Sequence, residues 1–189
     1  MMTDPLQEQN VGEFILENEG NLNIAVEVAR AFPAIQRQIV QDAMDAAEKH
    51  LRSDLGKEWE IWNDRDTVIV KPWAGIYFRR KSWGEIYIML EIWRREEATV
   101  VGVWRDRQQP KMAVLDAAIN TAFAKMPGKA NRYWAWYQEL PAEWGNWNLG
   151  AGLAAMHFRQ RELVGYWAEQ MFLVHKIASP VIDEFVKTK

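Results

Sequence analysis

Apolar residues recur at helical spacing in the first third of the chain. Ile24, Val28 and Phe32 lie four residues apart, and the repeat continues through Ile35, Ile39, Ala43, Ala47 and Leu51. Polar residues fill the other faces, which is typical of an amphipathic helix packed on a core. We therefore predict two helices or one bent helix over residues 22–56, with Pro33 in the first turn of the second helix and Gly56 at its end.

The period changes to two between residues 58 and 106, which predicts an antiparallel β-meander. The five predicted strands are Glu58–Trp62, Thr67–Pro72, Ile76–Lys81, Glu85–Arg94 and Thr99–Arg105. Trp73–Gly75 and Ser82–Gly84 have the composition of three-residue hairpin loops that end in glycine. These loops would set Pro72 opposite Ile76 and Lys81 opposite Glu85, and a four-residue loop over 95–98 would set Arg94 opposite Thr99.

With this register each strand separates its side chains onto two faces. The first face carries Trp59, Ile61, Val68, Val70, Ile76, Phe78, Ile86, Ile88, Leu90, Ile92, Val101 and Val103. The second face mixes aromatic and charged residues: Trp62, Ile69, Lys71, Tyr77, Arg79, Tyr87, Met89, Glu91, Trp93 and Trp104. Aromatic groups of this size do not all stand in water in a free monomer. Either the terminal helix and the segment from Trp134 to Trp147 cover this face, making a third layer, or part of it is a groove for a partner.

Helical spacing returns after the meander. Val114, Leu115, Ala118, Ile119, Ala122 and Phe123 form one apolar stripe, and a second stripe runs from Leu163 to Phe185 with a kink expected at Pro180. Between them, residues 133–147 are aromatic but interrupted by Pro141 and Gly145, so we predict short helices and turns there. The fold class is therefore α+β, a single domain over residues 1–189 with N-terminal helices (22–56), a five-stranded antiparallel meander (58–106) and C-terminal helices with a tryptophan-rich segment (111–189).

The composition of the chain excludes several kinds of reactive or binding site. The 189 residues include 11 tryptophans and no cysteine, which excludes disulfides, thiolate metal sites and a cysteine nucleophile. The net charge of −3 gives the whole molecule no attraction to nucleic acid or to an anionic membrane. The first residues do not resemble a signal peptide, and no apolar run is long enough for a membrane span. We expect a cytoplasmic protein that does not enter a membrane.

The residue types that carry catalysis do not occur in catalytic patterns. None of the three histidines has a second ligand at metal-binding spacing, and no serine lies in a G-x-S-x-G turn. Asp64, Asp66, Glu85 and Glu91 lie on or beside predicted strands, where metal-dependent nucleases place carboxylates, but an acidic-x-Lys motif is missing at Glu91. The sequence therefore predicts no catalytic centre, no metal and no cofactor.

Two sets of residues remain as candidate binding sites. Basic residues gather toward one end of the predicted sheet, where they form either an anion or nucleic-acid site or a solvated rim: Arg79, Arg80, Lys81, Arg105 and Arg107. The predicted partner-binding residues are four from the second face and two tryptophans from hairpin tips: Tyr77, Tyr87, Trp93, Trp104, Trp73 and Trp83. An indole at the tip of a loop has the least reason to be there for packing within the domain, so these two tryptophans are the first candidates for binding.

The aromatic segment Asn131–Leu140, followed by Trp144, Trp147 and a long helix ending at Phe185, resembles the C-terminal accessory region of bacterial and phage proteins of the PD-(D/E)XK nuclease family. The similarity covers about residues 32–185 and consists of loose, compositional motifs. The family's catalytic residues belong to a domain that we expect this chain to lack, so nuclease activity does not carry over. The resemblance implies a recognition module from a phage or mobile element.

Together these observations predict a non-enzymatic interaction protein that binds another protein, for instance an inhibitor or adaptor in phage and host conflict. Two alternatives stay open: a nucleic-acid-binding module that uses the basic end of the sheet, and a small-molecule pocket on the aromatic face. A homo-oligomer is also compatible with the sequence.

Overall fold

The computed structural model describes residues 5–67, 71, 73–93, 98–106, 112–144 and 150–188, and the side chains of residues 9 onward within these ranges. These residues form five α-helices and one five-stranded antiparallel sheet, which confirms the predicted α+β class. The helices are α1 (Pro5–Leu16), α2 (Glu19–Asp54), α3 (Met112–Ala122), α4 (Gly150–Phe158) and α5 (Gln160–Lys187). The strands are β1 (Trp59–Asn63), β2 (Trp73–Arg80), β3 (Ile86–Trp93), β4 (Ala98–Arg105) and β5 (Trp134–Glu139), and short 3₁₀ helices cover Lys81–Trp83 and Ala142–Trp144.

The chain divides into two compact units, Met1–Gln38 and Ile39–Lys189. Helix α2 contributes to both, because it runs without a break from Glu19 to Asp54. The prediction that Pro33 opens a second helix was wrong, since Pro33 lies inside α2. In the second unit Ala43, Ala47 and Leu51 of the predicted apolar stripe are buried as expected, together with Val40 and Met44. The earlier part of the stripe, Ile24, Val28, Phe32 and Ile35, is exposed, so the expectation that it packs on a core was wrong.

The strands of the sheet follow one another in chain order, β1-β2-β3-β4-β5. Two of the sequence predictions for the first half of the sheet were wrong. Trp73–Gly75 is not a hairpin loop but the start of β2, and β1 pairs directly with β2, placing Ile61 opposite Phe78. In the segment predicted as a strand over 67–72, Thr67 lies in a turn and Lys71 in a bend, and Val68, Ile69, Val70 and Pro72 are outside the described residues.

The register of the next hairpin was predicted correctly, and that of the hairpin after it was not. Phe78 lies opposite Ile88, which is the register predicted from Lys81 and Glu85, although Lys81 itself lies in the 3₁₀ helix and Glu85 precedes β3. The loop between them closes through Gly84, whose φ of 61° is one that residues with a side chain rarely adopt. In the following hairpin Ile92 lies opposite Thr99, two residues away from the predicted register. A two-residue slip preserves the faces, because side chains alternate with period two.

The fifth strand lies where short helices and turns were expected. Trp134–Glu139 pairs antiparallel with β4, and a bulge between Val103 and Trp104 interrupts the register. Gly102 makes this approach possible, since a Cβ there would collide with the backbone of the opposing strand at Trp136 and Tyr137. The bulge also places Trp134 and Tyr137 on the same face, although they are three residues apart.

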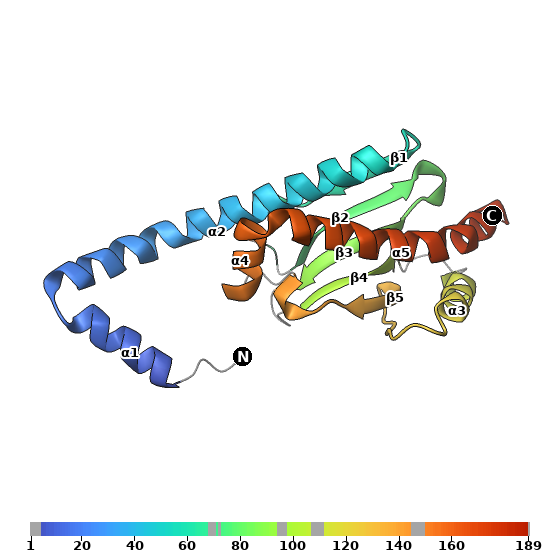
Figure 1. The fold of residues 1–189 in the computed structure, drawn as a ribbon. Coiled ribbons are helices and arrows are strands. Elements are labelled where there is room, and N and C mark those ends of the chain that lie inside the picture. Colours follow the sequence, from blue (N-terminus) through green and yellow to red (C-terminus); the bar gives the residue numbers. More distant parts are fainter. Residues whose placement is uncertain are drawn as a thin grey trace. The chain divides into compact units, whose positions relative to one another are not determined.

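The helices of the second unit contribute to a single core on the first face of the sheet. This core joins side chains from α2, α3, α4 and α5 to those of the strands, among them Ile76, Phe78, Ile88 and Trp136. Figure 1 shows α5 (red) running across the strands on this side. The expectation that the terminal helix covers the second face was therefore wrong. Among the described residues, the apolar cluster on the second face contains side chains of the strands alone.

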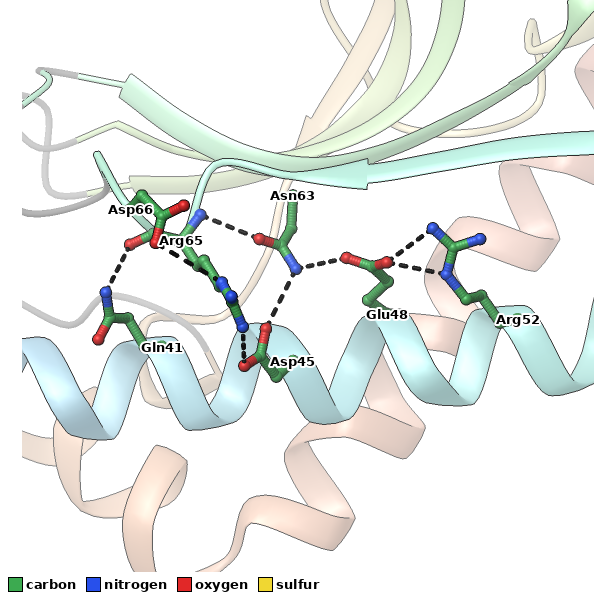
Figure 2. Close-up of polar contacts among 7 residues, drawn as sticks. All are labelled: Gln41, Asp45, Glu48, Arg52, Asn63, Arg65 and Asp66. Carbon is green, nitrogen blue, oxygen red and sulfur yellow. Dashed lines mark hydrogen bonds and ion pairs between the residues drawn. The ribbon is translucent and has the colours of Figure 1, made fainter.

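A polar network fastens α2 to the edge strand β1 (Figure 2). Asn63 Nδ2 donates to Glu48 Oε2 at 2.5 Å, and Arg65 Nη1 lies 2.5 Å from Asp45 Oδ2. Arg52 Nη2 donates to the backbone oxygen of Ile61 at 2.7 Å. That contact occupies an acceptor on the unpaired side of β1, so the helix protects an edge that could otherwise pair with another strand.

Candidate functional site: an aromatic sheet face

The second face of the sheet is lined with aromatic side chains from all five strands. We call it the aromatic sheet face and define it by Trp62, Trp73, Tyr77, Tyr87, Trp93, Trp104, Trp134 and Tyr137. Five of the six predicted partner-binding residues lie on it. Strand alternation places them there: Trp73 and Tyr77 are four residues apart in β2, and Trp73 lies directly opposite Trp93 of β3.

One half of this face is built around Arg79. The Trp62 and Tyr77 rings stack with centroids 5.6 Å apart, and Tyr87 meets Tyr77 edge to face at 5.6 Å. The Arg79 guanidinium lies over two of these rings, 5.2 Å from the centroid of Trp62 and 4.8 Å from that of Tyr87. Trp104 extends the row, 5.4 Å from Tyr87. Cation–π and edge-to-face contacts fix the orientation of each ring.

Carboxylates hold this arginine in place. Arg79 Nε donates to Glu60 Oε2 at 3.1 Å, and its Nη1 lies 3.2 Å from Glu85 Oε1 and 2.8 Å from the Tyr87 hydroxyl. Tyr87 in turn donates to Glu85 Oε2 at 2.6 Å. Burial, reinforced by this hydrogen bond, raises the pKa of Tyr87 to about 12. The same bond, received from Tyr87, lowers the pKa of Glu85. The hydroxyl is therefore a fixed donor at neutral pH.

The other half of the face contains Trp93, Trp134 and Tyr137. Trp93 lies 5.2 Å from Tyr137 and 6.3 Å from Trp134, measured between ring centroids. These rings pack with Met89 and Val100, which are 8% and 0% exposed. A side chain on a sheet face without a helix above it stays this dry only where its neighbours lie over it. Trp134 and Tyr137 are themselves buried, at 2% and 8% exposed, whereas Trp93 is partly exposed and lies against them.

The two tryptophans predicted at loop tips have opposite environments. Trp73 is 58% exposed, at the rim of the aromatic sheet face. Trp83, in the 3₁₀ turn between β2 and β3, is fully buried in the core of the first face, so the expectation of an exposed indole was wrong there. Its ring meets Trp59 edge to face at 5.2 Å, and its Nε1 donates to Asp183 Oδ1 at 2.7 Å. A partner on the surface has no access to it.

Sequence reasoning left Trp134 and Tyr137 out of the site because it did not predict β5. Trp62 was placed on the correct face but not among the binding residues. The available signal for β5 was the run of aromatic residues from Tyr133 to Tyr137, a composition that favours strands. The bulge beside Trp104 breaks the alternation of faces, and this hid the strand from a period-two pattern.

The predicted basic site lies at one end of the sheet as expected, but its arginines are paired within the chain. Besides Arg79, Arg80 lies 2.5 Å from Asp183. Arg105 is buried and binds both oxygens of Asp116, each at 2.5 Å. Such pairs cancel most of the field that an anion would meet. Lys81 is exposed in the turn, and Arg107 lies outside the described residues.

Three other kinds of site bear on the function: a metal centre, a surface pocket and a membrane-spanning helix. No three His, Asp or Glu side chains of the described residues converge as metal ligands. Two surface pockets open near Arg80, one beside Asp183 and Lys187 and the other beside Lys57 and Glu60, and neither is lined by an aromatic residue. No helix in the described part of the chain is both long and apolar enough to cross a membrane.

Comparison of the chain with protein-family models, curated proteins and solved structures found no match.

Proposed function

We propose that this chain is a non-enzymatic interaction protein that binds another protein through its aromatic sheet face. The observation that carries the proposal is a group of partly exposed rings, Trp62, Tyr77, Tyr87, Trp93 and Trp104, beside the exposed Trp73, on a sheet face over which no described helix of the second unit packs. Trp, Tyr, Met and Arg are the residues that protein interfaces favour and that carry most of their binding energy. All four residue types occur on this face.

Nucleic acid is the weaker candidate for the same surface. Aromatic sheet faces do stack unpaired bases, but they work with cations that neutralise the phosphates. Here Arg79, the arginine among the rings, is held by Glu60 and Glu85. Contact with a neutral or mixed-charge protein surface fits these rings better than contact with a polyanion.

The biological setting is a separate part of the proposal. An inhibitor or adaptor from a phage or mobile element is supported by the resemblance of the aromatic segment to the accessory region of PD-(D/E)XK proteins. The contacts on the sheet face do not depend on that setting.

The test is capture of partners from the native host by the tagged full chain, with variants at Trp73, the most exposed ring of the face, and at Tyr77, which is partly buried. Trp73→Ala and Tyr77→Ala should each weaken binding of the captured protein by about 2 kcal/mol or more, as hot-spot aromatic residues do. Phe158→Ala is the matched control, because Phe158 is an exposed aromatic residue at the end of α4, away from the sheet face. Trp73→Ala and Phe158→Ala should unfold near the wild-type temperature, and Tyr77→Ala somewhat lower, because it removes a ring that packs on Trp62 and Tyr87.

Two results would count against the proposal. One is equal capture by the Trp73, Tyr77 and Phe158 variants. The other is binding of single-stranded nucleic acid that weakens steeply with salt, which would assign the face to the nucleic-acid alternative.

A further inference from the structure

A short connection joins helices α1 and α2 in the first unit of the chain. Between α1 and α2, Asn18 Oδ1 accepts the backbone N–H of Asn21 at 2.9 Å, which caps the start of α2. Asn21 Nδ2 also donates to the backbone oxygen of Phe14 at 2.8 Å, at the end of α1. Side-chain contacts on both helix ends therefore define the connection between the two helices.

The apolar side chains of these helices stand in water. Nine of them are between 40% and 77% exposed: Val11, Phe14, Leu16, Leu22, Ile24, Val26, Val28, Phe32 and Ile35. From Leu22 to Ile35, ten of the fourteen residues are Ala, Val, Leu, Ile or Phe. A helix that is apolar over so much of its circumference is normally buried.

The polar residues between Asn23 and Ile35 occupy one narrow stripe of α2. At 3.6 residues per turn, Glu19, Asn23, Glu27, Arg30 and Arg37 share one side of the helix. The two acidic and two basic residues balance, and Glu27 pairs with Arg30 at 2.9 Å. This stripe lacks the excess of Lys and Arg that attracts an amphipathic helix to a lipid surface.

The opposite side has the spacing that helices use to pack on one another. Ala25, Val28, Phe32 and Ile35 follow at intervals of three, four and three, which is the a and d pattern of a heptad. The nine exposed side chains together present on the order of 800 Å² per chain, about what one partner contributes to a standard-size interface. Two copies of this helix pair would supply the four helices of a bundle.

We propose that residues 11–35 form a homodimer interface, in which a second copy of this chain covers the apolar sides of α1 and of the first half of α2. The proposal is independent of the aromatic sheet face. Interfaces of this size bind with dissociation constants from micromolar to picomolar, so the full chain should be dimeric at about 100 µM. Its mass in solution should be twice the 22.1 kDa of one chain.

Sedimentation or light scattering of the full chain tests this. Phe32→Glu and Val28→Glu place a charge in the apolar seam, and each should raise the dissociation constant of the dimer by at least about 100-fold. Asn23→Glu is the matched control, because it adds the same charge on the polar stripe and should leave the dimer intact. Urea unfolding of all three should match wild type below dimer-forming concentrations, since none of these residues belongs to the core of the second unit.

A monomeric wild type at about 100 µM would overturn the proposal, because an interface of this area is populated there. So would a dimer that survives both Phe32→Glu and Val28→Glu. If Trp73→Ala dissociated that dimer instead, the self-contact would belong to the sheet face.

Discussion

Replacing Trp83 measures how much one buried side chain and its hydrogen bond contribute to the stability of the core. Trp83→Phe keeps an aromatic ring in the fully buried site but removes the N–H that reaches Asp183 at 2.7 Å. A hydrogen bond to a charged acceptor contributes about 1.5–3 kcal/mol to stability. The Asp183 side chain is 28% exposed, so water replaces the lost donor only in part. The smaller ring adds about 1 kcal/mol for the gap it leaves.

The expected loss is therefore about 2–4 kcal/mol in the free energy of unfolding. Urea titration followed by circular dichroism measures it from the shift in midpoint at constant slope. The melting temperature should fall by about 5–15 °C, on the scale of a few degrees per kcal/mol for a chain of this size. Trp73→Phe is the control, since that indole is 58% exposed and its change should stay within about 0.5 kcal/mol.

A Trp83→Phe variant that is no more destabilised than Trp73→Phe would contradict a stabilising role for this hydrogen bond. A double-mutant cycle sharpens the test. Trp83→Phe combined with Asp183→Ala should show a coupling of at least about 1 kcal/mol, because each change removes the indole–carboxylate contact. Additive effects would mean that the indole acts through its volume alone.

Three further predictions follow from charged and titrating groups. Burial lowers the pKa of His175, so the folded chain favours the neutral ring, and the free energy of unfolding should fall as pH drops below about 6.5; His175→Phe should reduce the difference between urea midpoints at pH 7.5 and 5.5, and an unchanged difference would contradict this. Tyr87 should ionise near pH 12 in an absorbance titration, with the stability it contributes complete below pH 10 and lost as pH rises through 12; Glu85→Gln should lower that pKa, and a titration indistinguishable from wild type would argue against the hydrogen bond. Asp116→Ala leaves Arg105 buried without its carboxylate and should cost about 3–5 kcal/mol in urea unfolding; replacing both, by Arg105→Met in the same chain, should recover part of the loss.

The α+β class and the faces of the strands were accessible from sequence because they depend on local alternation. The Phe78–Ile88 register was also accessible, since the turn before Gly84 demands a residue that tolerates positive φ. The pairing of β1 with β2 was not, because Trp73–Gly75 has the composition of a turn but continues a strand. Turn composition is a local preference that strand pairing overrides.

The part of the candidate site that depends on the alternation of side chains along a strand was predictable. Tyr77, Tyr87, Trp93 and Trp104 fell on the correct face because each alternates with a buried aliphatic neighbour. Burial of Trp83 depended on Asp183, one hundred residues away, and no local pattern reports such a contact. The same holds for the basic residues. Their shared position at one end of the sheet was predictable, but the carboxylates that neutralise them come from other elements: Glu60 of β1 and Glu85 for Arg79, Asp183 of α5 for Arg80, and Asp116 of α3 for Arg105.

The closure of Met89 and Val100 under rings of their own sheet has a kinetic consequence. The described rings of this face are already packed on one another without a partner, and no described helix of the second unit has to move aside. Association with a preorganised surface loses little conformational entropy and proceeds without a slow rearrangement. Binding through this face should therefore follow single-exponential kinetics whose rate rises linearly with partner concentration. The residence time of a complex would then depend on how well the partner fits the rings.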